Sequence, residues 1–89
     1  MERKEIDTEA ELILQTKKWL EKAKKEMQNA VIKDESKADA LRNAKNYIKD
    51  CSYFIEKNDW VRAFEAVIYA YGILDTLKRL GIIEIEEKS

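Results

Sequence analysis

The chain holds few residues of the kinds that carry out chemistry. Among its 89 residues there is no histidine. Acid and base catalysis rests mostly on histidine, or on a carboxylate pair whose pKa values are driven apart. Glu65 and Asp75 lie on one predicted helix, but their separation corresponds to about 15 Å of helical rise, too far to share a proton. We therefore expect no catalytic residues, and we expect that the protein is not an enzyme.

Metal, cofactor and redox sites are equally poorly supplied. One thiol and scattered carboxylates do not match the ligand spacing of zinc or di-iron sites. The only glycines are Gly72 and Gly81, which are too few for a phosphate-binding loop. Cys51 falls between Ile48 and Ile55 on an apolar helix face, where a thiol is buried and unreactive. The sequence therefore predicts no metal and no cofactor.

Basic residues gather on one face of the first predicted helix. Lys18, Lys22 and Lys25 share this face, and Trp19 lies near its edge. Such a stripe could contact phosphates and stack a base. A solvated lysine surface is the more common arrangement, and the net charge of −1 gives no overall field that attracts nucleic acid. Nucleic-acid binding is therefore the alternative hypothesis, with Lys18, Trp19, Lys22 and Lys25 as the candidate phosphate contacts.

The elements that would position these residues are helices. Apolar residues recur with helical spacing in three segments, over residues 8–32, 37–57 and 59–80. Each start carries a capping signal, and these signals are Thr8 with Glu11, Ser36 with Asp39, and Asn58 or Asp59. The short second connection forces the last two helices to run antiparallel. We therefore predict one all-α domain over residues 1–89, an up-down-up three-helix bundle whose second and third helices form a hairpin.

The two ends of the chain differ in character from the bundle. Residues 1–7 are a charged lead-in. Gly81 fits the left-handed position that closes a helix, with Ile82 folding back on Leu77. Residues 82–89 alternate like a strand but have no strand partner in a helical sequence, so we expect an extended or frayed tail.

The third helix is apolar around most of its circumference. A bundle of three helices covers only the sides that face two neighbours, and leftover apolar surface usually marks an interaction site. Gly72 inside the helix costs roughly 1 kcal/mol relative to alanine, which is easiest to understand where another helix approaches the backbone. We therefore predict a protein-interaction or assembly module that forms a homodimer through this helix or docks an unidentified partner protein. We expect Trp60, Tyr71 and Leu74 to be buried in the monomer, which leaves as candidate contacts Ala63, Ala66, Tyr69, Gly72 and Ile73.

Aromatic residues offer one further alternative. They could wall a pocket for a planar ligand, although aromatic residues at helical spacing more often pack in a core or an interface. The residues concerned are Tyr47, Tyr53, Trp60, Tyr69 and Tyr71.

The location of the protein follows from what its ends and apolar runs lack. No apolar run approaches the roughly 18 to 20 residues of a membrane-spanning helix. The charged opening is not followed by the apolar segment of a secretory signal. We expect a cytoplasmic protein with no membrane contact.

Residues 53–75 read YFIEKNDWVRAFEAVIYAYGILD. This stretch resembles the signature of a small archaeal family, the domain of unknown function 357, and the resemblance extends over residues 40–82. It implies a compact all-helical domain in an archaeal cytoplasm. It brings no activity, cofactor or catalytic residue.

Overall fold

The computed structural model describes residues 8–86 and contains three α-helices. They are α1 (Thr8–Asn29), α2 (Ala38–Glu56) and α3 (Trp60–Arg79). The shorter elements are the strand β1 (Ala30–Ile32), the 3-10 helix η1 (Glu35–Lys37) and the strand β2 (Ile83–Ile85). The predicted lead-in over residues 1–7 and the last three residues of the predicted tail lie outside the described part.

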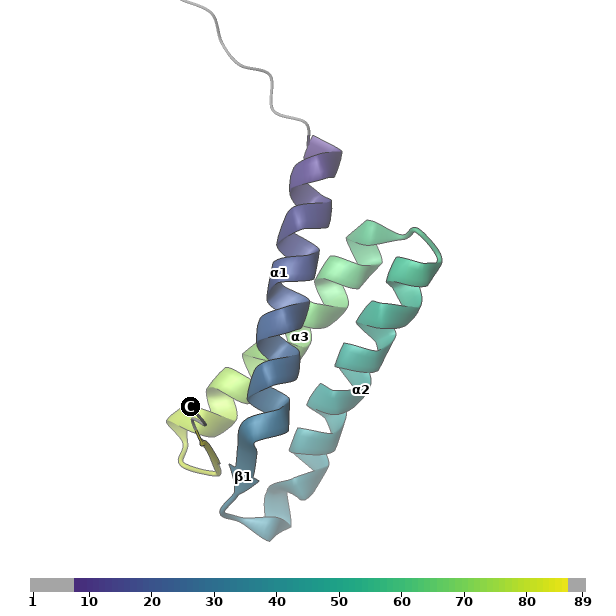
Figure 1. Ribbon diagram of the computed structural model, residues 1–89. Coiled ribbons are helices and arrows are strands. Elements are labelled where there is room, and N and C mark those ends of the chain that lie inside the picture. The colour runs from purple at the N-terminus through teal and green to yellow at the C-terminus, as the bar shows by residue number, and fades with distance from the viewer. Residues whose placement is uncertain (1–7, 87–89) are drawn as a thin grey trace, which may run out of the picture.

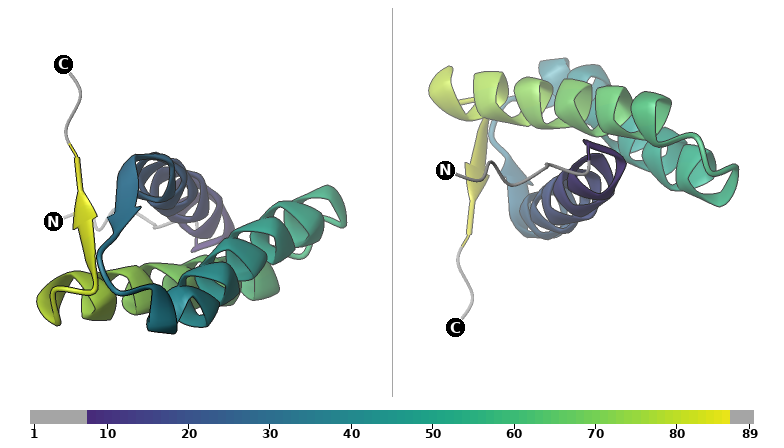
Figure 2. Two further views of the ribbon diagram at one scale, coloured as in Figure 1. Left: turned by 90° about the horizontal axis from the view of Figure 1, so that it is seen from below. Right: turned by 90° about the horizontal axis from the view of Figure 1, so that it is seen from above.

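The helices form the predicted up-down-up arrangement (Figure 1). Helices α2 and α3 pack along their lengths as a hairpin, and α1 forms a second layer that crosses this hairpin (Figure 2). Helix α1 contacts α3 far more than it contacts α2. The prediction of an all-α bundle with a hairpin of the last two helices is confirmed.

The turn between α2 and α3 is built by Asn58 and Asp59. Asn58 adopts the left-handed conformation with φ 59°, and its side-chain oxygen accepts a hydrogen bond from Trp60 Nε1 at 2.8 Å. The Asp59 carboxylate accepts from the backbone N–H of Arg62 at 3.1 Å and from its guanidinium at 2.7 Å. Of the two predicted caps, Asp59 is therefore the one that starts α3.

The predicted cap at Ser36 is wrong. The Asp34 carboxylate instead accepts hydrogen bonds from the Ser36 backbone N–H at 3.1 Å and from its hydroxyl at 2.6 Å. These hydrogen bonds mark the start of η1. Helix α2 begins only at Ala38, and the side chain of Lys37, the residue before it, makes no capping hydrogen bond. An aspartate two residues before a serine can form this local turn. Ser36 then lies inside η1 and not at the residue that precedes α2, so its hydroxyl does not cap that helix.

The end of α3 is closed as predicted. Gly81 has φ 75°, and its N–H donates to the carbonyl of Lys78 at 3.0 Å while the N–H of Ile82 donates to the carbonyl of Leu77 at 2.9 Å. This pair of bonds is a Schellman motif, in which glycine takes the left-handed position without steric cost.

The prediction of a tail without a strand partner is wrong. Strand β2 pairs antiparallel with β1, so that Ala30 lies opposite Ile85 and Ile32 lies opposite Ile83. Helix α1 consequently ends at Asn29, three residues before the predicted end. The partner strand could not be recognised in the sequence, because residues 30–32 continue the helical pattern of α1. The β-branched side chains of Val31 and Ile32 suit a strand equally well.

The core consists of two clusters, of which the first is rich in alanine. The cluster between α1 and the turn end of the hairpin contains Ala23, Ile48, Cys51, Ala63, Ala66, Val67 and Ala70. The cluster beneath the small sheet contains Ala44, Leu74, Leu77 and Ile83. Met27 packs against both clusters. Small side chains at these positions let the helix backbones approach closely, so the bundle is held by close helix packing.

Candidate functional site

The predicted contact residues on α3 divide into two groups. Ala63 and Ala66 are buried in the core, so the expectation that they form an external contact is wrong. Their small side chains lie where α3 meets its neighbours within the monomer. Tyr69 and Gly72 are exposed, and Ile73 is half-buried. Periodicity could not separate these groups, because α3 is apolar on almost every side.

The exposed group belongs to a surface that we call the α2–α3 patch, formed by Tyr47, Ile68, Tyr69, Gly72 and Ile73. The rings of Tyr47 and Tyr69 lie 5.5 Å apart, which joins the two helices at the surface. Tyr69 nevertheless keeps 63% of its surface exposed. A hollow of about 470 Å³ lies beside it, and no charged residue is among those that line it, which are Ala40, Ile68, Tyr69, Gly72, Ile73, Thr76 and Leu77.

Gly72 has no packing partner that would explain it. Apart from its chain neighbours and the backbone of its own helix, a Cβ atom added there would meet no atom within 4 Å among the described residues. The monomer therefore does not require glycine at this position, although glycine within a helix costs roughly 1 kcal/mol relative to alanine. The backbone of α3 at Gly72 is open to whatever covers the patch.

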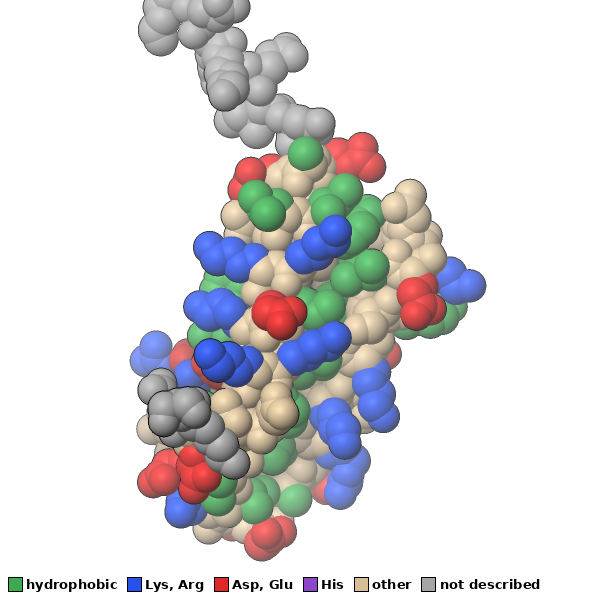
Figure 3. Space-filling model, in the orientation of Figure 1, with side chains coloured by type: hydrophobic (Ala, Val, Ile, Leu, Met, Phe, Trp, Pro, Cys, Tyr) green, Lys and Arg blue, Asp and Glu red, His purple; other side chains and the backbone are tan. Residues whose placement is uncertain are grey.

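The predicted phosphate-binding face on α1 is only partly assembled. The Trp19 ring packs edge-on against Tyr71 at 4.9 Å, and Lys22 Nζ lies 4.9 Å from the Trp19 ring centre. The half-buried indole is thus already covered by an aromatic ring and a cation, whereas base stacking needs a free ring face. Lys18 and Lys25 are exposed. Along α1 in Figure 3, basic side chains lie on both sides of an acidic one.

The aromatic residues do not wall one pocket. Tyr47 pairs with Tyr69, Tyr53 packs against Phe54, and Tyr71 packs against Trp19, so the rings are distributed over three places. Trp60 is half-buried at the start of α3. Of the residues expected to be buried in the monomer, Leu74 is fully buried and Tyr71 is half-buried.

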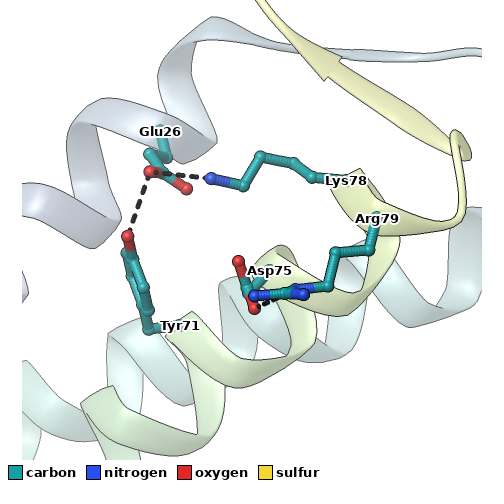
Figure 4. A network of polar contacts seen from close by, with 5 residues as sticks. All are labelled: Glu26, Tyr71, Asp75, Lys78 and Arg79. Atoms are coloured by element: carbon teal, nitrogen blue, oxygen red, sulfur yellow. Dashed lines mark hydrogen bonds and ion pairs between the residues drawn. The ribbon is translucent and has the colours of Figure 1, made fainter.

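A polar cluster between α1 and α3 was missed in the sequence (Figure 4). Glu26 Oε2 lies 3.2 Å from Lys78 Nζ and accepts a hydrogen bond of 3.4 Å from the Tyr71 hydroxyl. The second carboxylate oxygen of Glu26 is buried and has no hydrogen-bond partner in the described part of the chain. Burial, followed by the negative charge of Glu26, raises the pKa of Tyr71. These contacts fix α1 on α3.

The spacing of these residues contained a usable signal. Glu26 follows Trp19 by two helical turns, and Lys78 follows Tyr71 by two turns, so each pair shares one helix flank. The two flanks meet only because α1 packs on α3. Asp75 and Arg79 form a separate ion pair of 2.8 Å one turn along α3 (Figure 4).

Cys51 is completely buried in the first core cluster, as predicted. Burial raises the pKa of its thiol to about 11. Within residues 8–86, no three Cys, Asp or Glu side chains gather closely enough to hold a metal ion. In the same range, no helix combines the length and the apolar character needed to cross a membrane.

Comparison with known proteins gives two positive findings. Residues 12–83 match the family DUF357, whose description is a protein of unknown function. The fold is similar to the crystal structure of a DUF357 protein from Archaeoglobus fulgidus, with a TM-score of 0.79 and 36% sequence identity. That match covers 90% of this chain and 100% of the other. No curated protein is significantly similar in sequence.

Proposed function

The chain belongs to the DUF357 family, whose description assigns no activity, and we propose that it is a non-enzymatic interaction module that pairs with a second copy of itself. The observation that carries the proposal is the α2–α3 patch. Its two tyrosines and its apolar hollow lie at the surface of the described monomer. Exposed tyrosine beside apolar side chains is typical of protein interfaces, because the ring buries a large apolar area while its hydroxyl keeps a polar contact.

A second copy suits the patch because of its charge. In a two-fold dimer the same patch of both copies is buried, so a patch that carried charge of one sign would repel its copy. The residues that line the hollow are uncharged. Gly72 leaves the α3 backbone open at the same place. Two copies of this surface could therefore meet closely without like-charge repulsion.

Nucleic-acid binding through α1 is the weaker hypothesis. It needs Trp19 as a stacking platform, and this ring is already packed against Tyr71 and Lys22.

The cytoplasmic location expected from the sequence stays a prediction.

The test is the absolute mass in solution, measured by size-exclusion chromatography with light scattering over a dilution series. A mass near twice 10.5 kDa is expected at high concentration. Tyr69→Glu is expected to shift this mass to that of the monomer, because each copy would then have to bury a carboxylate in an apolar contact. Gly72→Gln is expected to act in the same direction by filling the open space.

Val61→Glu is the matched control. Val61 lies on the same helix and is 60% exposed, close to the 63% of Tyr69, but it lies outside the patch. It should leave the mass of the dimer unchanged. A wild-type chain that is monomeric at every concentration, or a dimer that survives Tyr69→Glu, would overturn the proposal.

A further inference from the structure

A second surface lies between α1 and α2, away from the α2–α3 patch. The two helices have few contacts with each other, because each of them packs mainly against α3. A groove of about 640 Å³ remains between them, lined by Lys24, Met27, Gln28, Ala38, Leu41, Arg42, Lys45, Ile48 and Lys49. We call this surface the α1–α2 groove.

The floor and the rims of the groove differ in chemistry. Met27, Leu41 and Ile48 supply an apolar floor, and the cationic side chains stand on both sides of it. Lys24 comes from α1, whereas the other three cations follow one another along α2. Figure 3 shows this face, with basic side chains over both helices and hydrophobic side chains between them.

The charge of the rims is largely uncompensated. Arg42 forms an ion pair of 2.6 Å with Asp39, at one end of the groove. Within residues 8–86, no carboxylate lies within ion-pair distance of Lys24, Lys45 or Lys49. The residues that line the groove include four cations and no acid. A second copy of this surface would therefore be repelled, and an acidic partner would be attracted.

The length of the groove indicates the shape of the ligand. Ala38 and Lys49 are eleven residues apart on α2, which is about 16 Å or three helical turns. Arg42, Lys45 and Lys49 repeat along this length with helical spacing. An amphipathic helix laid in the groove would cover the floor with its apolar stripe and bring acidic residues on its flanks to both rims. Met27 suits such contacts because its side chain adapts to different shapes.

Other anionic ligands fit less well. A fatty acid carries its charge at one end, whereas the cations here are distributed along the groove. Single-stranded nucleic acid stacks its bases on aromatic rings, and none of the residues that line the groove is aromatic. We infer that the α1–α2 groove binds an amphipathic helix of a partner protein, with leucine-like side chains on the floor and Asp or Glu on both flanks.

The test uses a fluorescein-labelled peptide of repeated heptads, with leucine at positions a and d and glutamate at e and g. Its binding to the full chain is followed by fluorescence anisotropy at two salt concentrations. The peptide is expected to bind, and more weakly at high salt because the rim contacts are charged. Lys45→Glu combined with Lys49→Glu is expected to lower the affinity about tenfold or more, because it reverses two charges along one rim.

The matched control combines Lys18→Glu with Lys25→Glu. It changes the net charge equally but lies outside the groove, so it should leave the affinity within about twofold. Circular dichroism checks that both variants remain folded. An equal loss of affinity in both variants would show a general charge effect and overturn the inference.

Three comparison ligands test the chemistry of the partner. The first is the same peptide with lysine in place of glutamate, and the second has serine in place of leucine. Both are expected to bind at least tenfold more weakly, because each lacks one of the two contacts. The third is oligothymidylate. Binding of either comparison peptide as tight as that of the test peptide, or tighter binding of oligothymidylate, would overturn the inference.

Discussion

At the scale of single residues, the most informative side chains are those whose environment departs from the ordinary. Glu26 places one carboxylate oxygen beside Lys78 and Tyr71 and the other in a buried position, where no described residue forms a hydrogen bond with it. Burying part of a charged group is tolerable only when it is paired. Glu26 and Lys78 are thus coupled across two helices, and their contribution is to position α1 on α3.

Cys51 leads to a prediction about pH. Burial raises the pKa of its thiol from 9.0 to about 11, so the folded chain holds this proton more tightly than the unfolded chain does. The resulting stabilisation is fully present below pH 9 and is lost as the pH rises towards 11. We expect the unfolding free energy of the wild type to fall more steeply over this range than that of Cys51→Ala.

The measurement is urea unfolding at several pH values between 8 and about 11 for both chains. Lysine and tyrosine titrate in the same range but are shared by the two chains, so the difference between the curves isolates the thiol. Parallel curves would contradict the prediction. Ellman's reagent gives a second check, because the buried thiol should react slowly in the folded chain and rapidly in denaturant.

At the scale of the elements, the pairing of β1 with β2 completes the second core cluster, which lies beneath the small sheet. Ile83 is only 2% exposed and joins Ala44, Leu74 and Leu77 in one cluster. The backbone extends the pairing on both sides, through hydrogen bonds from Lys33 to Ile82 and from Glu86 to Asn29. The segment after α3 is therefore a structural element that covers the ends of the helices.

Truncation of Ile83 tests this role. Ile83→Ala is expected to lower the unfolding free energy by about 2–4 kcal/mol, because it removes a fully packed side chain and leaves a cavity. Glu84→Ala is the control in the same strand, since Glu84 is exposed and its ion pair with Lys33 spans 3.9 Å. The unfolding free energies of both variants are measured by urea denaturation and compared with that of the wild type. Equal, small effects would mean that the strand contributes little to the core.

At the scale of the whole molecule, the two core clusters form one unit. Met27 packs against both, and α3 supplies residues to both. The two open surfaces lie on opposite sides of α2, since the α2–α3 patch uses its side towards α3 and the α1–α2 groove uses its side towards α1. A single copy of the protein could therefore bind a second copy through the α2–α3 patch and an amphipathic helix in the α1–α2 groove at the same time.

This continuity predicts cooperative unfolding. Tryptophan fluorescence reports on Trp19, which packs against the first cluster, and on Trp60 at the start of α3, whereas circular dichroism reports on all helices. We expect the two signals to follow one urea transition, and Leu74→Ala in the second cluster to shift both by about 3 kcal/mol. Leu80→Ala, at an exposed position, should shift neither appreciably. Separate transitions would show that the clusters unfold independently.

The three helices, the hairpin, a cap at Asn58 or Asp59, the end of α3 at Gly81 and the burial of Cys51 could all be predicted from the sequence. These features depend on side-chain periodicity and on hydrogen bonds between near neighbours, so a local reading captures them. The predicted cap before α2 was wrong, because Asp34 and Ser36 both suit that position. The predicted first helix was also too long, because helix and strand patterns overlap at residues 30–32.

Features that depend on contacts between distant segments could not be predicted from the sequence and became visible in the tertiary structure. The partner of β2, the contact of Glu26 with Lys78 and the division of α3 into buried alanines and exposed Tyr69 all follow from how α1 crosses the hairpin. An apolar helix can turn several faces inward at similar cost. Which face is covered is set by the packing of its neighbours, and this information lies outside any local stretch of sequence.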